Sequence, residues 1–256
     1  MSEPDTTTNT SLAPMTSVMW VRNLIDALIA SGLDGTQLAI QAGIKQETLE
    51  IIESGVWVKE IIRLWELATE ASGNQAIGLQ AAQTFRPSSV GVLGYSMMAS
   101  PNLFEALQRG IRYSGSVTTA TTASLTRIDD GYRFAFHIMS GVVDVQRQNH
   151  EYVISSFLLF FRWIAGRDLR PIRVEFMHPK PSELAVYQSF FDCPLVFGSA
   201  HSALVFSESD LARRLLTSNP LLTGILDQAA AQRTLEMGKA EMTQRVRQLI
   251  VQALPK

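Results

Sequence analysis

The sequence predicts an α+β fold in which helix dominates, and three observations lead to that prediction. Between residues 18 and 85 the apolar residues recur at helical spacing without an interrupting strand pattern. Alternation of apolar and polar residues, typical of half-buried strands, is confined to the middle of the chain. Helical spacing returns over residues 220–254. We therefore expect an N-terminal helical part, a small mixed or antiparallel sheet packed with helices, and a C-terminal helical linker.

These patterns divide the 256 residues into four segments. Residues 1–16 are polar and acidic, so a disordered tail is expected. Residues 17–86 should form a helical subdomain, and residues 87–218 an α+β subdomain. Residues 219–256 should form the C-terminal helical region. A hydrophobic content of 46% against 18% charged residues is ample for a sizeable core.

Glycines mark the ends of the two longest N-terminal helices. Gly32 should close the helix that begins near Val18, and Gly73 the helix whose apolar stripe begins at Val58, because glycine adopts the left-handed cap conformation readily. Two shorter helices are expected after Asp34 and Asn74, and this part of the chain is predicted to be all helix.

Two further helices precede the sheet. The first should cover residues 90–99, and the second residues 102–113. Ser100 and Pro101 would supply a cap and a first-turn proline for the second helix.

A β-hairpin should follow, with strands in segments 117–128 and 132–139 around the turn sequence Asp129-Asp130-Gly131. Alternation places the side chains of its second strand on two faces. One face carries Tyr132, Phe134 and Phe136, and the other Arg133, Ala135 and His137.

A long helix is expected over residues 145–165, and its second half is apolar nearly all round. Arg162 lies in this apolar run, where an unpaired guanidinium would be costly. It must therefore find a carboxylate, backbone carbonyls or water, and a structural role is expected. The elements expected after this helix are a strand over 172–176, a helix from Ser182 to Cys193-Pro194, a hairpin of 195–197 with 203–206, and helices over 207–216 and 220–254.

Composition excludes several classes of protein. The 22 basic and 24 acidic residues give a net charge of −2, so the chain lacks the basic surplus that DNA binding needs. One cysteine, Cys193, excludes an internal disulfide and fits a reducing compartment. The N-terminus resembles no targeting peptide and no run of 18 apolar residues exists, so we expect a cytoplasmic protein without a membrane partner.

Motifs of catalysis, metal binding and cofactor binding are missing. His150-Glu151 lacks the second histidine of a metalloprotease helix, and the histidines are too dispersed for a metal site. Residues 37–50 have the form of a helix-turn-helix, but Lys45 stands against Glu47, Glu50 and Glu53, which would repel phosphates. We expect no enzyme, no metal and no cofactor, and two packed helices at 37–50.

Three blocks of sequence together resemble one known family. They are GVLGYSMMASPNLFEAL, FRWIAGR and HPKPSELAVYQSFFDCPLVFG followed by ALVF. They resemble the N-terminal, arabinose-binding-like regulatory domain of AraC-type bacterial transcription regulators, from about Val18 to the end. The resemblance implies a domain that senses a small-molecule effector, with DNA bound only through a C-terminal helix-turn-helix domain that is missing here. A scaffold that dimerises the regulator without a ligand is the alternative.

An effector pocket is expected between the helices over 91–113, the strand over 132–139 and the long helix. Aromatic and apolar walls and a few polar anchors are needed. The ligand-binding candidates are Tyr95, Met98, Arg112, Tyr113, Phe134, His137 and Trp163. The alternative is that these side chains fill a solid core.

An amphipathic stripe in the last helix predicts a partner for that helix. Its members are Met242, Val246, Leu249 and Ile250. The stripe serves equally to dock the helix on its own domain or to form the seam of a homodimer.

Overall fold

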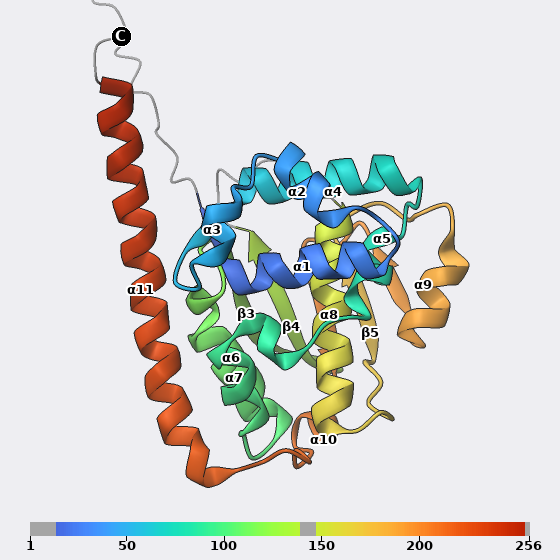
Figure 1. Ribbon diagram of the computed structural model, residues 1–256. Helices are drawn as coiled ribbons and strands as arrows, with labels where there is room; N and C mark the ends of the chain where they lie inside the picture. Colours follow the sequence, from blue (N-terminus) through green and yellow to red (C-terminus); the bar gives the residue numbers. More distant parts are fainter. Residues whose placement is uncertain (1–13, 139–146, 254–256) are drawn as a thin grey trace, which may run out of the picture.

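The computed structural model describes residues 14–138 and 147–253, and Figure 1 shows how their elements are arranged. One hydrophobic cluster runs from the N-terminal helices through α8 to the sheet. This architecture confirms the predicted α+β class. The N-terminal helices are α1 (Val18–Ala30), α2 (Gly35–Gln41), α3 (Gln46–Glu50), α4 (Val58–Ser72) and α5 (Ile77–Ala82).

The predicted helix ends are confirmed in this part. Gly32 and Gly73 have φ angles of 89° and 62°, in the left-handed region that favours glycine. Asp34 caps α2, since its Oδ1 accepts the N–H of Gln37 at 3.0 Å. Gly43, with φ of 90°, forms the bend before α3.

The prediction that the N-terminal part is all helix is wrong. Strand β1 (Met15–Ser17) pairs antiparallel with β2 (Gly55–Trp57). Met15 and Thr16 are buried, so the expected disordered tail does not extend to residue 16. Sequence periodicity missed these strands because each has three residues, too few to establish an alternation.

The middle segment contains the 3₁₀ turn η1 (Pro87–Val90), α6 (Val92–Met98), α7 (Leu103–Arg112) and the 3₁₀ turn η2 (Ser114–Ser116). The cap of α7 is Asn102 and not Ser100, because Asn102 Oδ1 accepts the N–H of Glu105 at 2.8 Å. Ser100 instead donates its hydroxyl to the carbonyl of Ser96 at the end of α6.

A five-stranded sheet has the order β3-β4-β7-β5-β6. Its strands are β3 (Thr121–Ile128), β4 (Gly131–Ile138), β5 (Arg173–Phe176), β6 (Leu195–Phe197) and β7 (Ser202–Phe206). The β3–β4 hairpin is confirmed, while its predicted last residue, 139, lies outside the described residues. The predicted hairpin of β6 with β7 is wrong. Strand β5 lies between them and pairs with both, parallel to β6 and antiparallel to β7, so β6 and β7 do not pair with each other.

Helix α8 (Arg147–Ala165) is the central element of the core, and residues 145 and 146 of the prediction lie outside the described part. Helix α9 (Leu184–Phe191) begins two residues after the predicted Ser182 and has no side-chain cap bond. It ends at Asp192, which adopts the left-handed conformation with φ of 52°.

Helices α10 (Glu208–Leu211) and α11 (Pro220–Ala253) end the described chain. Helix α11 lies along one side of the molecule, and α9 lies at the other side (Figure 1). The inner face of α11 includes the buried Ala230 and Met237 and packs against α6 and η2. Among the described helices none is long and apolar enough to cross a bilayer.

Candidate functional site

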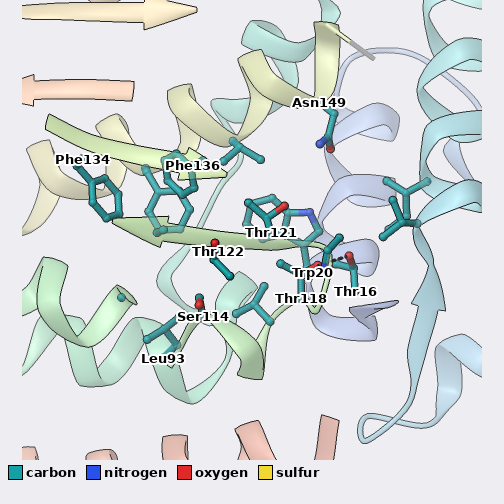
Figure 2. A pocket seen from close by; sticks show the side chains of 18 of the residues that line it. Thr16, Trp20, Leu93, Ser114, Thr118, Thr121, Thr122, Phe134, Phe136 and Asn149 are labelled. Atoms are coloured by element: carbon teal, nitrogen blue, oxygen red, sulfur yellow. Dashed lines mark hydrogen bonds between the residues drawn. The ribbon is translucent and has the colours of Figure 1, made fainter. Parts of the chain in front are cut away.

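A cavity of about 100 Å³ lies where the N-terminal helices meet the β3–β4 hairpin. Figure 2 shows Phe134 and Phe136 toward one end, and Thr16, Thr118 and Trp20 toward the other. Its walls come from β1, α1, α4, α6, α7, η2, β3, β4 and α8. The described lining residues are Thr16, Trp20, Val58, Ile61, Ile62, Leu93, Gly110, Ser114, Val117, Thr118, Ala120, Thr121, Thr122, Ala123, Phe134, Phe136, Asn149, Val153 and Phe157.

Aromatic rings form the apolar wall. Phe134 and Phe136 meet edge to face with centroids 4.9 Å apart, and Phe136 lies 5.3 Å from Phe157. Such aromatic pairs add stabilisation beyond the area that they bury. Asn149, Val153 and Phe157 recur every four residues on α8, which places them on one face of the helix. The sequence therefore builds this wall from one face of β4 and one face of α8.

Hydroxyl and amide groups form the polar part of the lining. The hydroxyls of Thr16 and Thr118 are 3.0 Å apart, and the carbonyl of Met15 accepts the Thr118 hydroxyl. Asn149 Oδ1 accepts the indole N–H of Trp65 at 3.1 Å, which orients the amide. Thr122 lies opposite His137 on the other face of the hairpin, whereas the hydroxyl of Thr121 and the amide nitrogen of Asn149 have no hydrogen-bond partner in the described part of the chain. These groups are free to bond a ligand.

No Asp, Glu, Lys, Arg or His occurs among the described residues that line the cavity. A charged ligand would lose its hydration there without gaining an opposite charge, which costs several kcal/mol or more. A neutral ligand pays no such penalty. The lining therefore favours an uncharged, largely apolar molecule with one or two hydrogen-bonding groups.

Of the seven residues predicted to bind a ligand, only Phe134 lines this cavity. Tyr95 and Trp163 are 47% and 51% exposed, since α6 and α8 turn other residues toward the cavity. His137 lies on the opposite face of β4 from Phe136, as strand alternation requires. There its Nε2 is 2.6 Å from the Ser124 hydroxyl, and its ring packs on that of His201.

The other three candidates also lie outside the lining. Tyr113 is buried in the core cluster beside η2, and the guanidinium of Arg112 lies over its ring at 5.9 Å. Met98 packs against the core, and its carbonyl accepts the Thr217 hydroxyl. The helices over 91–113, β4 and α8, between which the pocket was expected, each contribute residues to this cavity, but helical phase and strand alternation select different side chains on them.

Sequence reasoning missed the contribution of the N-terminal part. Thr16, Trp20, Val58 and Ile61 come from the segments assigned to a separate helical subdomain or to the tail. The signal available in the sequence was the threonine-rich run at 117–122, where hydroxyls follow one another before the hairpin. Its proximity to β1 depends on long-range pairing, which the sequence pattern does not specify.

A separate group of titratable residues surrounds the buried carboxylate of Glu151 on α8. Glu151 Oε1 accepts the hydroxyl of Tyr187 at 2.6 Å and lies 3.0 Å from Arg147 Nε and 3.5 Å from His178 Nε2. Burial raises the pKa of Glu151 to about 7 and lowers the pKa of the adjacent His150 to about 4. Within the described residues no cluster of His, Cys, Asp and Glu has the arrangement of a metal site.

The wall of the cavity also carries helix α11. Elements α6, α7 and η2 supply Leu93, Gly110 and Ser114 to the cavity, and the same elements contact α11. Asp227 of α11 accepts the Ser96 hydroxyl at 2.7 Å and the Arg109 Nε–H at 3.0 Å. The same three elements therefore line the cavity and contact α11.

Comparison with known proteins gives three similarities. Residues 32–215 match the profile of the arabinose-binding domain of AraC transcription regulators, N-terminal. The ornithine utilization regulator of Pseudomonas aeruginosa is 25% identical over 244 residues, which cover 93% of this chain and 71% of that protein. The transcriptional regulator CdpR from Pseudomonas aeruginosa has a similar fold, with a TM-score of 0.54 at 16% identity. That similarity covers 75% of this chain and 65% of the CdpR chain.

Proposed function

The chain belongs to the family of arabinose-binding N-terminal domains of AraC transcription regulators, and from this premise we propose that it senses a small-molecule effector. The observation that carries the proposal is the cavity between the N-terminal helices and the β3–β4 hairpin. The function is regulatory rather than enzymatic: the effector controls a DNA-binding domain through α11.

The effector is uncharged and largely apolar. The described lining offers hydroxyls and one amide but no ionised group. A free amino acid would bring an ammonium and a carboxylate into this lining, and neither would find a counter-charge. The relative named for ornithine utilization therefore does not indicate the effector of this chain.

The volume of the cavity either limits the ligand to a very small molecule or requires the cavity walls to move when a larger ligand binds. Ligand pockets are commonly about 300–1,000 Å³, so a cavity of about 100 Å³ accepts only a few non-hydrogen atoms without change. A larger effector has to displace a wall. Elements α6, α7 and η2 form part of the cavity wall and also contact α11. We propose that their displacement by a bound effector moves α11 and so transmits the signal.

A dimerisation scaffold without a ligand is the second candidate. The outer face of α11 favours it, since Met242, Val246 and Ile250 are 57%, 47% and 55% exposed. These three side chains of the stripe therefore do not pack against the domain that carries them. The side chain of Leu249, the fourth member, is not among the side chains that the structure describes. An exposed apolar stripe is typical of a helix with a partner.

A thermal-shift screen separates the two candidates. We expect neutral alcohols, ketones or lactones to raise Tm and charged analogues of equal size to leave it unchanged. Ala123 faces Phe136 across the hairpin and lines the cavity. Ala123→Phe should fill the cavity and abolish the shift, while Thr126→Phe on the same strand should keep it. A protein that no neutral compound stabilises would leave the scaffold as the function.

A further inference from the structure

A second hollow lies on the side of the molecule away from α11, between η1, α8 and α9. This groove has a volume of about 790 Å³. Its described lining consists of Gln83, Phe85, Arg86, Pro87, Leu159, Phe160, Arg162, Trp163, Arg167, Arg170, Ser189, Phe190 and Asp192. None of these residues lines the effector cavity, so the groove is a separate site.

Trp163 is the unusual residue of the groove. Its side chain is 51% exposed, whereas Trp20, Trp57 and Trp65 are 5%, 9% and 0% exposed. Trp is among the residues that dominate binding energy at protein interfaces, together with Arg and Tyr. An exposed indole in a hollow therefore indicates a surface that another molecule covers.

The charge of the groove is strongly positive. Four arginines face a single aspartate among the described lining residues. Arg162 is committed to backbone carbonyls, and Arg170 pairs with Asp192 at 2.9 Å. Arg86 donates one nitrogen to carbonyls, and neither Arg86 nor Arg167 contacts a carboxylate of the described chain. Their guanidinium groups are available to an external anion.

We propose that this groove docks an acidic segment of a partner protein, with carboxylates on Arg86 and Arg167 and an apolar side chain against Trp163. A peptide segment carries several carboxylates and an apolar residue at successive positions, as this surface requires. Duplex DNA fits less well because the indole lies in a hollow and the whole chain carries a net charge of −2. Helix α9, which forms one side of the groove, lies on the opposite side of the molecule from α11 (Figure 1).

The test is a fluorescence titration of the whole chain with a synthetic hexapeptide of Asp and Glu that contains one Phe. We expect the emission of Trp163 to change on binding, and affinity to fall at least tenfold in Arg86→Glu and in Arg167→Glu. Binding should weaken as salt rises, because the pairs are exposed. Arg127→Glu, which changes an exposed arginine of the hairpin, should bind as the unaltered chain does.

Three outcomes would overturn the proposal. One is the absence of binding at about 50 mM salt, where screening is weak. Another is equal binding of a peptide with Lys in place of Asp and Glu, or of a 20-base-pair duplex. The third is concentration-dependent self-association that the two groove variants abolish, since the occupant would then be a second copy. Circular dichroism of each variant verifies that a lost signal does not come from unfolding.

Discussion

Three backbone carbonyls surround the guanidinium of Arg162, and they explain a charge inside an apolar helix. Its nitrogens donate to the carbonyls of Leu169, Phe190 and Phe191 at 3.1, 3.2 and 2.7 Å. The sequence left open whether a carboxylate, backbone carbonyls or water would bind this guanidinium, and the structure shows backbone carbonyls. One side chain thereby joins the end of α8, the following loop and the end of α9.

Replacing Arg162 by Leu should lower the free energy of unfolding by about 2–4 kcal/mol, because it leaves carbonyls without their donors. Urea denaturation of both proteins measures the difference. Arg167→Leu is the matched control, since it changes an exposed arginine nearby and should cost less than about 0.5 kcal/mol. Equal stability of both variants would show that water replaces the guanidinium without loss.

The buried carboxylate of Glu151 should make stability depend on pH. Its pKa is about 7 when folded, against an ordinary 4.5, so the folded state holds an extra proton between these values. Stability due to this group is present below pH 4.5 and is lost as pH rises through 7. His150 acts in the opposite direction: its folded pKa is about 4, so its contribution to stability is lost as pH falls from 6.5 to 4.

Glu151→Gln isolates the carboxylate, because Gln still accepts the Tyr187 hydroxyl but does not titrate. Its stability relative to the unaltered chain should rise by on the order of 2–3 kcal/mol between pH 4.5 and 8. The His150 contribution is common to both proteins and cancels. A difference in Tm that stays constant over this range would contradict the burial of an ionisable Glu151.

At the scale of elements, the sequence predicts those that carry local signals. Gly32, Gly73 and the Asp129-Asp130-Gly131 turn each specify a backbone conformation, and all three act as expected. The β1–β2 pair and the insertion of β5 between β6 and β7 depend on contacts between distant segments. Such pairings have no short-range signature. Most side chains that line the cavity have no local signature for the same reason, since its walls come from nine elements along the chain.

The attachment of α11 to α6 and α7 should depend on Asp227. Asp227→Ala removes the acceptor of Ser96 and Arg109, and we expect faster amide exchange in residues 220–240 with little change in the sheet. Asp227→Asn, which keeps an oxygen for both donors, should have a smaller effect. Unchanged exchange in Asp227→Ala would show that the apolar contacts of Ala230 and Met237 alone hold the helix.

The outer stripe of α11 predicts a homodimer. Val246→Asp should weaken any dimer measured by analytical ultracentrifugation, because it places a charge in the apolar seam. Val246→Ala, which changes the same position without adding a charge, is the control. A dimer that persists in Val246→Asp, with the fold intact, would place the interface elsewhere.

At the scale of the whole molecule, charge and shape define what the chain binds. A net charge of −2 and the carboxylates of Glu47, Glu50 and Glu53 in and beside α3 disfavour contact with DNA phosphates. We expect no specific promoter binding by residues 1–256 in a mobility-shift assay at about 0.15 M salt, where screening suppresses weak contacts. Tight binding under these conditions would contradict a sensor that depends on a separate DNA-binding domain.

We propose above that the cavity beside Phe134 and Phe136 binds a neutral small molecule. Native mass spectrometry of the purified chain, soaked with the stabilising compounds of the thermal-shift screen, tests it most directly. We expect one bound neutral molecule per chain, absent in Ala123→Phe and retained in Thr126→Phe. A bound molecule that is charged, or that persists when Ala123→Phe fills the cavity, would contradict it.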